Sequence, residues 1–313
     1  MRIVSLLPSA TEIVCRLGFE DALVGCSHEC DYPPSVQSLP HCTAPKFQPD
    51  GSSQEIHDRV TQLQSDANAV YRIETERLQA LKPDVIVTQA QCDVCAVSLD
   101  DVERAAQELF DQPPTIISLQ PTGLNDVFDD ILHVAKALGA ADQGEQVCQE
   151  LRARVHDITH RARNLDPKPR VVCLEWLSPL MAAGNWAPEL VERAGGQECA
   201  GQARRHSTWM EWDQLREIDP EYLILMPCGF SMQQTEADLP ALQSHEDWPK
   251  LRAVREGKVF ITDGNQYFNR PGPRLVESLE ILAEIMHPGQ FSFGHEGSGW
   301  RRINPTTASI SKP

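Results

Sequence analysis

The two halves of the sequence repeat one order of features, and this repetition constrains the fold more than any other property. Three segments of the first half, each with a buried apolar run, have a counterpart in the second half. The pairs are 3–7 with 170–174, 78–87 with 215–225, and 115–118 with 258–262. Short apolar runs that alternate with helical stretches indicate βαβ units and parallel sheets. We therefore predict an α/β fold in two lobes that share one topology.

Two stretches with helical periodicity, Leu124–Leu138 and Ala141–Asn164, lie between the halves. The second carries one apolar stripe, broken only by Gly144 in its first turn, and its roughly 24 residues would extend about 36 Å. A helix of this length can join two lobes without a flexible linker. We expect an N-terminal lobe at 1–122, a helical segment at 123–168, a C-terminal lobe at 169–290 and a disordered tail at 291–313.

Length, charge and cysteine content exclude several classes of protein. A chain of 313 residues is long enough for two lobes with separate cores. The net charge of −17 repels phosphate backbones, so no nucleic-acid partner is expected. No apolar run approaches the roughly 20 residues that span a bilayer. Ten irregularly spaced cysteines and the absence of a signal peptide favour the cytoplasm, or the periplasm or cell surface if a leader has been removed.

The N-terminal residues predict a strand that leads directly into a helix. The apolar run Ile3–Leu7 is followed by Ser9 and Glu12, which have the spacing of a capping box with the serine as N-cap. Gly18 then ends the helix. Further strands are expected at 23–25, 84–88 and 114–118, one helix at 99–110, and a last helix at 273–286.

Ligands of open parallel sheets bind at the carboxyl ends of the strands, so the loops that follow the strands are the candidate site. Aromatic side chains in or beside these loops can line a pocket for a broad, flat ligand, although single rings can instead belong to the core. These aromatic residues are Trp176, Trp186, Trp209, Tyr267 and Phe268. Arg270 is expected to meet an anionic group or an acidic partner, and Arg274 to pair with a carboxylate inside its own lobe.

Cysteine and histidine in the same loops indicate a second kind of chemistry. Cys92 and Cys95 form a C-x-x-C pair, and His28 with Cys30 would complete a soft tetrahedral metal site. Alternatively, Cys95 packs as a small buried side chain and Cys92 lines the cleft. His28, Cys92 and Cys228 each follow a strand, so we predict that all three face the cleft. His28 would then either coordinate a cobalt or iron centre or only hydrogen-bond its own loop.

Several motifs together resemble one known family. The segments 2–12, 81–86 and 270–274, with the long helix between the halves, are similar to the helical-backbone metal receptors, a class of periplasmic-type substrate-binding proteins. This family includes the cobalamin, haem and ferric-siderophore binding proteins of ABC importers, and the first and last motifs resemble its cobalamin branch. The resemblance covers Arg2 to about Pro288. It implies two Rossmann-like lobes with parallel sheets, joined by a long rigid α-helix, with the ligand in the cleft between them.

The resemblance implies a non-catalytic binding protein for cobalamin or a related corrinoid, which acts with an ABC transporter permease or as a soluble carrier. The ligand contacts that it implies are Tyr32, Gln91, Trp176, Trp186, Phe230, Asp263 and Tyr267. The cysteines at 30, 92, 95 and 228 depart from the exported members of the family. Two alternatives therefore stay open: a haem or ferric-siderophore binding protein, and a thiol- and histidine-dependent protein or enzyme that binds a transition metal ion.

Overall fold

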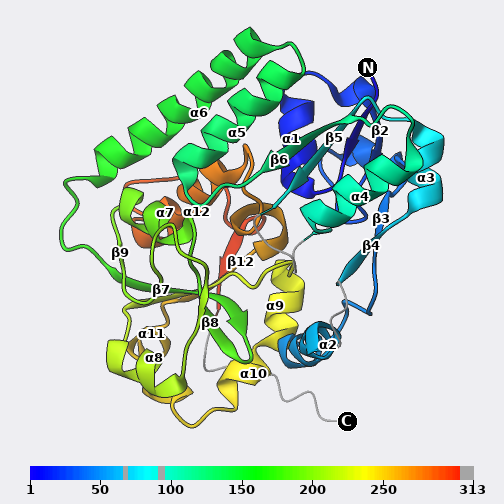
Figure 1. Ribbon diagram of the computed structural model, residues 1–313. Helices are drawn as coiled ribbons and strands as arrows, with labels where there is room; N and C mark the ends of the chain where they lie inside the picture. Colours follow the sequence, from blue (N-terminus) through cyan, green and yellow to red (C-terminus); the bar gives the residue numbers. More distant parts are fainter. Residues whose placement is uncertain (66–69, 91–95, 304–313) are drawn as a thin grey trace.

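The computed structural model describes residues 1–65, 70–90 and 96–303, and each half of the chain builds its own sheet (Figure 1). The first sheet has the parallel order β2-β1-β5-β6. Its strands are β1 (Ile3–Ser5), β2 (Leu23–Cys26), β5 (Val85–Gln89) and β6 (Thr115–Leu119). The second sheet repeats this order as β9-β7-β11-β12. These strands are β7 (Arg170–Leu177), β9 (Gln197–Glu198), β11 (Tyr222–Leu225) and β12 (Val259–Thr262). The predicted shared topology is confirmed.

Antiparallel strands extend this plan. β8 (Leu180–Ala182) and β10 (Thr208–Trp209) continue the second sheet beyond β7, and β13 (Trp300–Arg302) pairs with β12. In the first half, β3 (Thr43–Pro45) and β4 (Tyr71–Ile73) form a separate ribbon. The helix α2 (Ser53–Ser65) lies in the connection between them and reaches the second half of the molecule (Figure 1).

Helices cover the sheets, so the parallel strands are apolar along almost their whole length. In the first half these helices are α1 (Pro8–Arg16), α3 (Thr75–Leu81) and α4 (Leu99–Leu109), with 3-10 turns η1 (Glu20–Ala22) and η2 (Pro34–Ser38). In the second they are α7 (Ala187–Arg193), α8 (Trp212–Ile218), α9 (Met232–Asp238), α10 (Pro240–Gln243), α11 (Arg252–Arg255) and α12 (Leu275–Met286). The 3-10 turn η3 (Trp248–Lys250) and the π-helical turn η4 (Gly264–Phe268) complete this half.

The correspondence between the halves extends to single backbone angles. The helices α3 and α8 both end at a residue in the left-handed region, Lys82 with φ 44° and Asp219 with φ 41°. A proline follows each of these residues, and a residue before proline is disfavoured in the right-handed helical region. Each helix therefore stops there, and the chain enters the next buried strand, β5 or β11.

The start of α1 differs from the prediction. The helix begins at Pro8, and its N-cap is Leu7, whose side chain makes no capping bond. A proline at the first helical position already has the required φ angle and has no N–H to be capped. Ser9 and Glu12 therefore lie inside the helix and are buried, so the predicted capping box is wrong. Glu12 instead reaches across to Arg274 in the second half.

The two central helices are α5 (Leu124–Ala137) and α6 (Ala141–Ala162), as predicted apart from the last residue of α5 and the last two of α6. The apolar stripe of α6 is buried, and the helix packs against both α5 and α12. A Cβ atom on Gly144 would lie 2.5 Å from Cβ of Ala135. Gly144 is thus the residue that allows α5 and α6 to approach closely, instead of a weak point in the helix.

The predicted disordered tail from residue 291 is wrong for the segment up to Ile303. Phe291 and Trp300 are buried, and β13 closes the edge of the second sheet. Glu284 of α12 holds the segment, because its carboxylate accepts the indole N–H of Trp300 at 2.8 Å and the backbone N–H of Gly294 at 2.6 Å. The Gly- and Ser-rich composition of the segment suggested disorder, and it gave no sign of the hydrogen bonds to Glu284. Residues 304–313 lie outside the described part of the chain.

We expect Gly144→Ala to lower the free energy of unfolding by about 1–3 kcal/mol, because the added methyl group overpacks the contact with Ala135. In an ordinary helix interior the same change would stabilise by about 1 kcal/mol. Denaturant unfolding measures the difference. The matched control is Gly289→Ala, which has open space around the added atom and should stay within about 0.5 kcal/mol of wild type. A stabilised Gly144→Ala variant would contradict the close helix contact.

We also expect the lobes to move little when ligand binds, because α6 contains no glycine or proline after Glu145 and so resists hinge bending. Small-angle scattering with and without saturating ligand should give radii of gyration that agree within error. A clear decrease on ligand addition would show that the connection between the lobes is a hinge.

Candidate functional site

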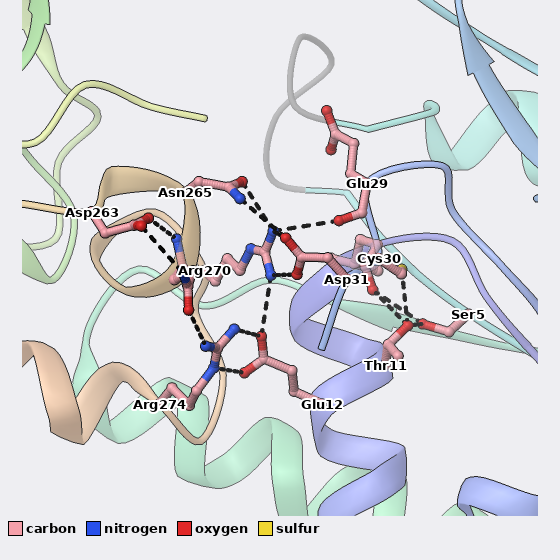
Figure 2. Close-up of polar contacts among 12 residues, drawn as sticks. Ser5, Thr11, Glu12, Glu29, Cys30, Asp31, Asp263, Asn265, Arg270 and Arg274 are labelled. Atoms are coloured by element: carbon pink, nitrogen blue, oxygen red, sulfur yellow. Dashed lines mark hydrogen bonds and ion pairs between the residues drawn. The ribbon is translucent and has the colours of Figure 1, made fainter. Parts of the chain in front are cut away.

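Two arginines and two carboxylates join the lobes (Figure 2). Arg274, at the start of α12, donates to both carboxylate oxygens of Glu12 on α1, at 2.6 and 3.0 Å. Arg270, in the loop after η4, pairs with Asp31 in the loop after β2, and its Nη1 lies 3.5 Å from Glu12 Oε1. Arg270, Arg274 and Glu12 are all buried. Arg270 thus meets an acidic partner, as predicted, whereas the partner of Arg274 lies in the other lobe, contrary to the prediction.

A neighbouring side chain orients the ion pair between Arg270 and Asp31. Asn265 of η4 accepts a hydrogen bond from Arg270 at 3.0 Å and donates one to Asp31 at 3.1 Å (Figure 2). Burial alone would raise the pKa of Asp31, but the bonds and charge of Arg270, with the bond from Asn265, hold it below its usual value. Asp31 therefore stays ionised at neutral pH, and the pair across the lobes is a full ion pair.

The predicted contacts Tyr32, Tyr267 and Asp263 surround the same cluster. The guanidinium of Arg274 lies 4.0 Å from the centre of the Tyr32 ring and 5.5 Å from that of Tyr267. Asp263 caps η4 by accepting the backbone N–H of Gln266 at 2.8 Å, and burial raises the pKa of Asp263. These residues connect the loop after β12 to the interface between the lobes.

His28 lies beside this cluster, on the wall of the first lobe. Its Nδ1 is 2.8 Å from Oγ1 of Thr43, and its ring packs at 5.3 Å from that of Tyr71. The hydroxyl of Thr43 in turn donates to Oγ of Ser27 at 3.0 Å. Burial, assisted by the charge of His41, lowers the pKa of His28 to about 4. The imidazole is therefore neutral at physiological pH.

Glu29 and Tyr71 lie beside His28 in the first lobe. Its Oε1 accepts a hydrogen bond from the Tyr71 hydroxyl at 3.2 Å. Desolvation by the surrounding protein raises the pKa of Glu29, although 39% of the side chain is exposed. Burial also raises the pKa of Tyr71 far above its usual value. The backbone carbonyl of Glu29 also accepts a hydrogen bond from Arg270 of the second lobe at 3.4 Å, so this residue lies next to the contact between the lobes.

The opposite wall belongs to the second lobe and contains Cys228 and Glu175. The backbone N–H of Cys228 donates to the carbonyl of Glu175 at 3.1 Å, and Ser207 holds the Glu175 carboxylate at 2.6 Å. Burial, reinforced by the charges of Glu175 and Glu29, raises the pKa of Cys228 well above its usual range. The charge of Glu29 acts on Cys228, so these residues of different lobes lie near each other. That His28, Cys92 and Cys228 all face the cleft stays a prediction.

Three further predicted contacts lie where α2 meets the second lobe. The indole N–H of Trp176 donates to the carbonyl of Ser53 at 3.1 Å, and its ring packs at 5.4 Å from that of Phe230. Trp209 is 56% exposed, and the His57 ring of α2 approaches it edge-on at 5.1 Å. Trp176 and Trp209 therefore contact the helix that crosses from the first lobe.

The structure places two predicted contacts in the protein interior instead of at the cleft. Trp186 is buried and donates its indole N–H to the carbonyl of Phe268 at 2.7 Å, because a buried indole needs an acceptor. Cys30 is also buried, and its sulfur lies 3.1 Å from Oγ1 of Thr11 on α1 (Figure 2). Both residues support the loops from behind.

The remaining predicted residues, Gln91, Cys92 and Cys95, lie outside the described residues. The proposed metal site of His28, Cys92 and Cys95 therefore stays a prediction. Within the ranges 1–65, 70–90 and 96–303, no group of three or more His, Cys, Asp and Glu side chains is arranged to hold a metal ion.

The prediction missed the acidic and phenolic groups of the cleft, Glu29, Glu175 and Tyr71. Glu29 stands between His28 and Cys30, and Glu175 directly precedes Trp176, so both occupy loops that were already candidates. Their charge was the signal that could have identified them. Tyr71 belongs to the short β3-β4 ribbon, where no periodicity marks it, and only the folded chain brings it to the cleft.

Comparison with known proteins assigns the class. The sequence matches the family described as periplasmic binding protein over residues 3–266, so the chain belongs to this family. Among its relatives is an uncharacterized ABC transporter substrate-binding lipoprotein, YvrC, of Bacillus subtilis, which is 21% identical over 93% of this chain and 81% of its own length. Another is the vitamin B12-binding protein of Vibrio cholerae, 24% identical over 92% of this chain and 90% of its own.

Solved structures have the same fold. The periplasmic vitamin B12 binding protein BtuF of Vibrio cholerae matches with a TM-score of 0.65 and 21% identity, over 91% of this chain and 96% of its own. A periplasmic heme binding protein from Pseudomonas aeruginosa matches with a TM-score of 0.69 and 19% identity, over 92% and 93%. The two-lobed fold is thereby confirmed.

The names of the relatives also bear on the location of the chain. The names of these relatives indicate a periplasmic protein or a lipoprotein, so the predicted cytoplasmic location has no support among them. In the described part of the chain, no helix combines the length and apolar character that crossing a membrane requires.

We expect Glu12→Gln to lower the free energy of unfolding by about 3–5 kcal/mol, because it leaves the buried Arg274 without its ionised partner. Denaturant unfolding at pH 7 measures this loss. The control is Glu150→Gln, which removes an exposed pair with Arg16 and should cost less than about 1 kcal/mol. Equal effects of the two variants would mean that the pair between the lobes contributes no more than a surface pair.

Proposed function

We propose that the protein is a non-catalytic binding protein for a corrinoid such as cobalamin, and that it delivers this ligand to an ABC transporter permease. The relatives named as vitamin B12-binding proteins favour this ligand, and the relative named as a substrate-binding lipoprotein favours the transporter partner. A soluble carrier role is the variant of this proposal in which no permease takes part.

The observation that carries the proposal is the acidic character of the cleft. Glu29 and Glu175 face it, and desolvation already raises the pKa of both. The nearby cations Arg270 and Arg274 are occupied by Asp31 and Glu12. An anionic ligand would therefore meet carboxylates, whereas a ligand rich in N–H donors or positive charge would satisfy them.

A corrinoid has the matching chemistry. Its macrocycle is broad and flat, which suits the rings of Tyr71 and Trp176, and its peripheral amide side chains can donate to Glu29 and Glu175. Haem carries two carboxylates, and ferric siderophores are commonly anionic. Haem or a ferric siderophore would therefore need a cation in the cleft. Arg270 and Arg274 are the nearby cations, and both already pair with carboxylates at the contact between the lobes.

Several features favour binding over catalysis. The imidazole of His28 is neutral and held by Thr43, and burial keeps the thiol of Cys228 protonated. A nucleophile needs an adjacent base that accepts its proton, and the hydrogen bonds of the described residues do not pair these two groups. The thiol-dependent enzyme alternative therefore ranks below the binding protein.

A ligand panel tests the proposal. Thermal unfolding is followed with aquacobalamin, cobinamide, haemin and a ferric siderophore. We expect the corrinoids to stabilise, by about 2.7 kcal/mol at a ligand concentration 100 times the dissociation constant. Stabilisation by haemin or the siderophore but by neither corrinoid would refute the corrinoid assignment.

The double variant Glu29→Gln/Glu175→Gln tests whether the negative charge of these two residues selects the ligand. It removes two negative charges from the cleft and keeps the side-chain shapes, so corrinoid binding should weaken and haemin binding should strengthen. Glu150→Gln, on the surface of α6, removes a charge far from the cleft and should leave both affinities unchanged.

A further inference from the structure

We propose that Nε2 of His28 is the axial nitrogen ligand of the bound corrinoid's cobalt, and that the preferred ligand is a corrinoid with one axial position open to the protein. This inference rests on the proposed function. It adds a residue with a defined role and narrows the ligand class to corrinoids without a coordinated base of their own.

The hydrogen bonds around His28 support one tautomer. The hydroxyl of Thr43 lies 3.0 Å from Ser27 Oγ and can donate to it. In that arrangement the Thr43 oxygen accepts from both nitrogens of His28, the backbone N at 3.2 Å and Nδ1 at 2.8 Å. The tautomer that belongs to our proposal has the ring proton on Nδ1 and the lone pair on Nε2.

The same bonds hold the Nδ1 side of the ring and leave Nε2 without a hydrogen bond among the described residues. The side chain of His28 is 19% exposed, and Nε2 lies 3.9 Å from Oε1 of the cleft residue Glu29, beyond hydrogen-bond distance. Within the described chain, Nε2 has no hydrogen-bond partner, whereas Nδ1 is anchored. A histidine that binds a metal typically donates its other ring N–H to a fixed acceptor, which sets the ring orientation. Thr43 is that acceptor here.

The other electron-pair donors of the cleft are worse candidates. Cys228 would have to lose its proton next to Glu175 and Glu29, whose charges oppose a thiolate. The Tyr71 hydroxyl already donates to Glu29, and this bond occupies the carboxylate oxygen nearest to His28. Imidazole nitrogen also suits cobalt better than a carboxylate does. In the proposed tautomer, Nε2 of His28 is thus a donor that is both unprotonated and without a hydrogen bond among the described residues.

Paramagnetic resonance of the Co(II) form tests the coordination directly. Co(II) cobinamide has no base of its own, so any axial nitrogen coupling must come from the protein. We expect each cobalt line of the wild-type complex to split into a triplet, and into a doublet when the protein contains 15N-labelled histidine. The inference is wrong if bound cobinamide shows no nitrogen coupling, or if the coupling stays a triplet with 15N-labelled histidine. This test uses the wild-type protein and needs no variant.

Variants identify which histidine binds. His28→Ala should abolish the coupling and weaken cobinamide binding at least tenfold, the lower end of what loss of a supporting residue around a metal costs. His133→Ala, which removes an exposed histidine of α5, should change neither. Retained coupling in His28→Ala would also overturn the inference.

Thr43 provides the test of orientation. Thr43→Val keeps the shape of the side chain but removes the acceptor of the Nδ1 proton, so cobinamide affinity should fall about 10- to 100-fold. Thr43→Ser keeps the hydroxyl and should restore the affinity and the nitrogen coupling.

The two proposals fail in different ways. If cobinamide and cobalamin both stabilise the protein but no histidine nitrogen is coupled, axial ligation is wrong and corrinoid binding stands. If neither corrinoid stabilises the wild-type protein in the ligand panel, both are wrong.

Discussion

The buried ion pair between Glu12 and Arg274 and the partly exposed pair between Asp31 and Arg270 determine how the two lobes meet. A buried pair gains little net stability, since desolvation offsets most of the attraction, but it is costly to break. The bidentate geometry between α1 and the start of α12 therefore acts as a constraint on orientation. The loops of the cleft keep their separation because these helices are joined at one end and α6 spans the two lobes behind them.

This constraint also sets the charge of the cleft. Both arginines are engaged in holding the lobes together, so their charge is compensated before a ligand arrives. Desolvation raises the pKa of both Glu29 and Glu175, although the charge of Arg270 partly offsets this effect at Glu29. The choice of ligand class thus follows from the distribution of a few charges more than from the overall fold, which haem and vitamin B12 binding proteins share.

Much of the fold could be predicted, because strands and helices depend on local periodicity and on prolines. A helix end followed by proline occurs once in each half, at Lys82-Pro83 and at Asp219-Pro220, and this repeat indicated two similar lobes. The length of α6 indicated that a helix connects them. The site was predicted only in part. His28, Arg270 and Cys228 were proposed because residues after parallel strands gather at one edge, and the structure shows the expected acidic partner of Arg270. Trp186 and Cys30 follow the same rule and still turn inward.

The sequence by itself determined the α/β class, the internal repeat and the loops that form the cleft, since these follow from hydrophobic spacing along the chain. Only the tertiary structure decided the partners of individual side chains. Glu12 has the spacing of a capping residue but binds an arginine 262 positions away. Trp300 lies in a Gly- and Ser-rich segment but is anchored by Glu284. Such contacts join residues far apart in the chain, and no local pattern encodes the distance between them.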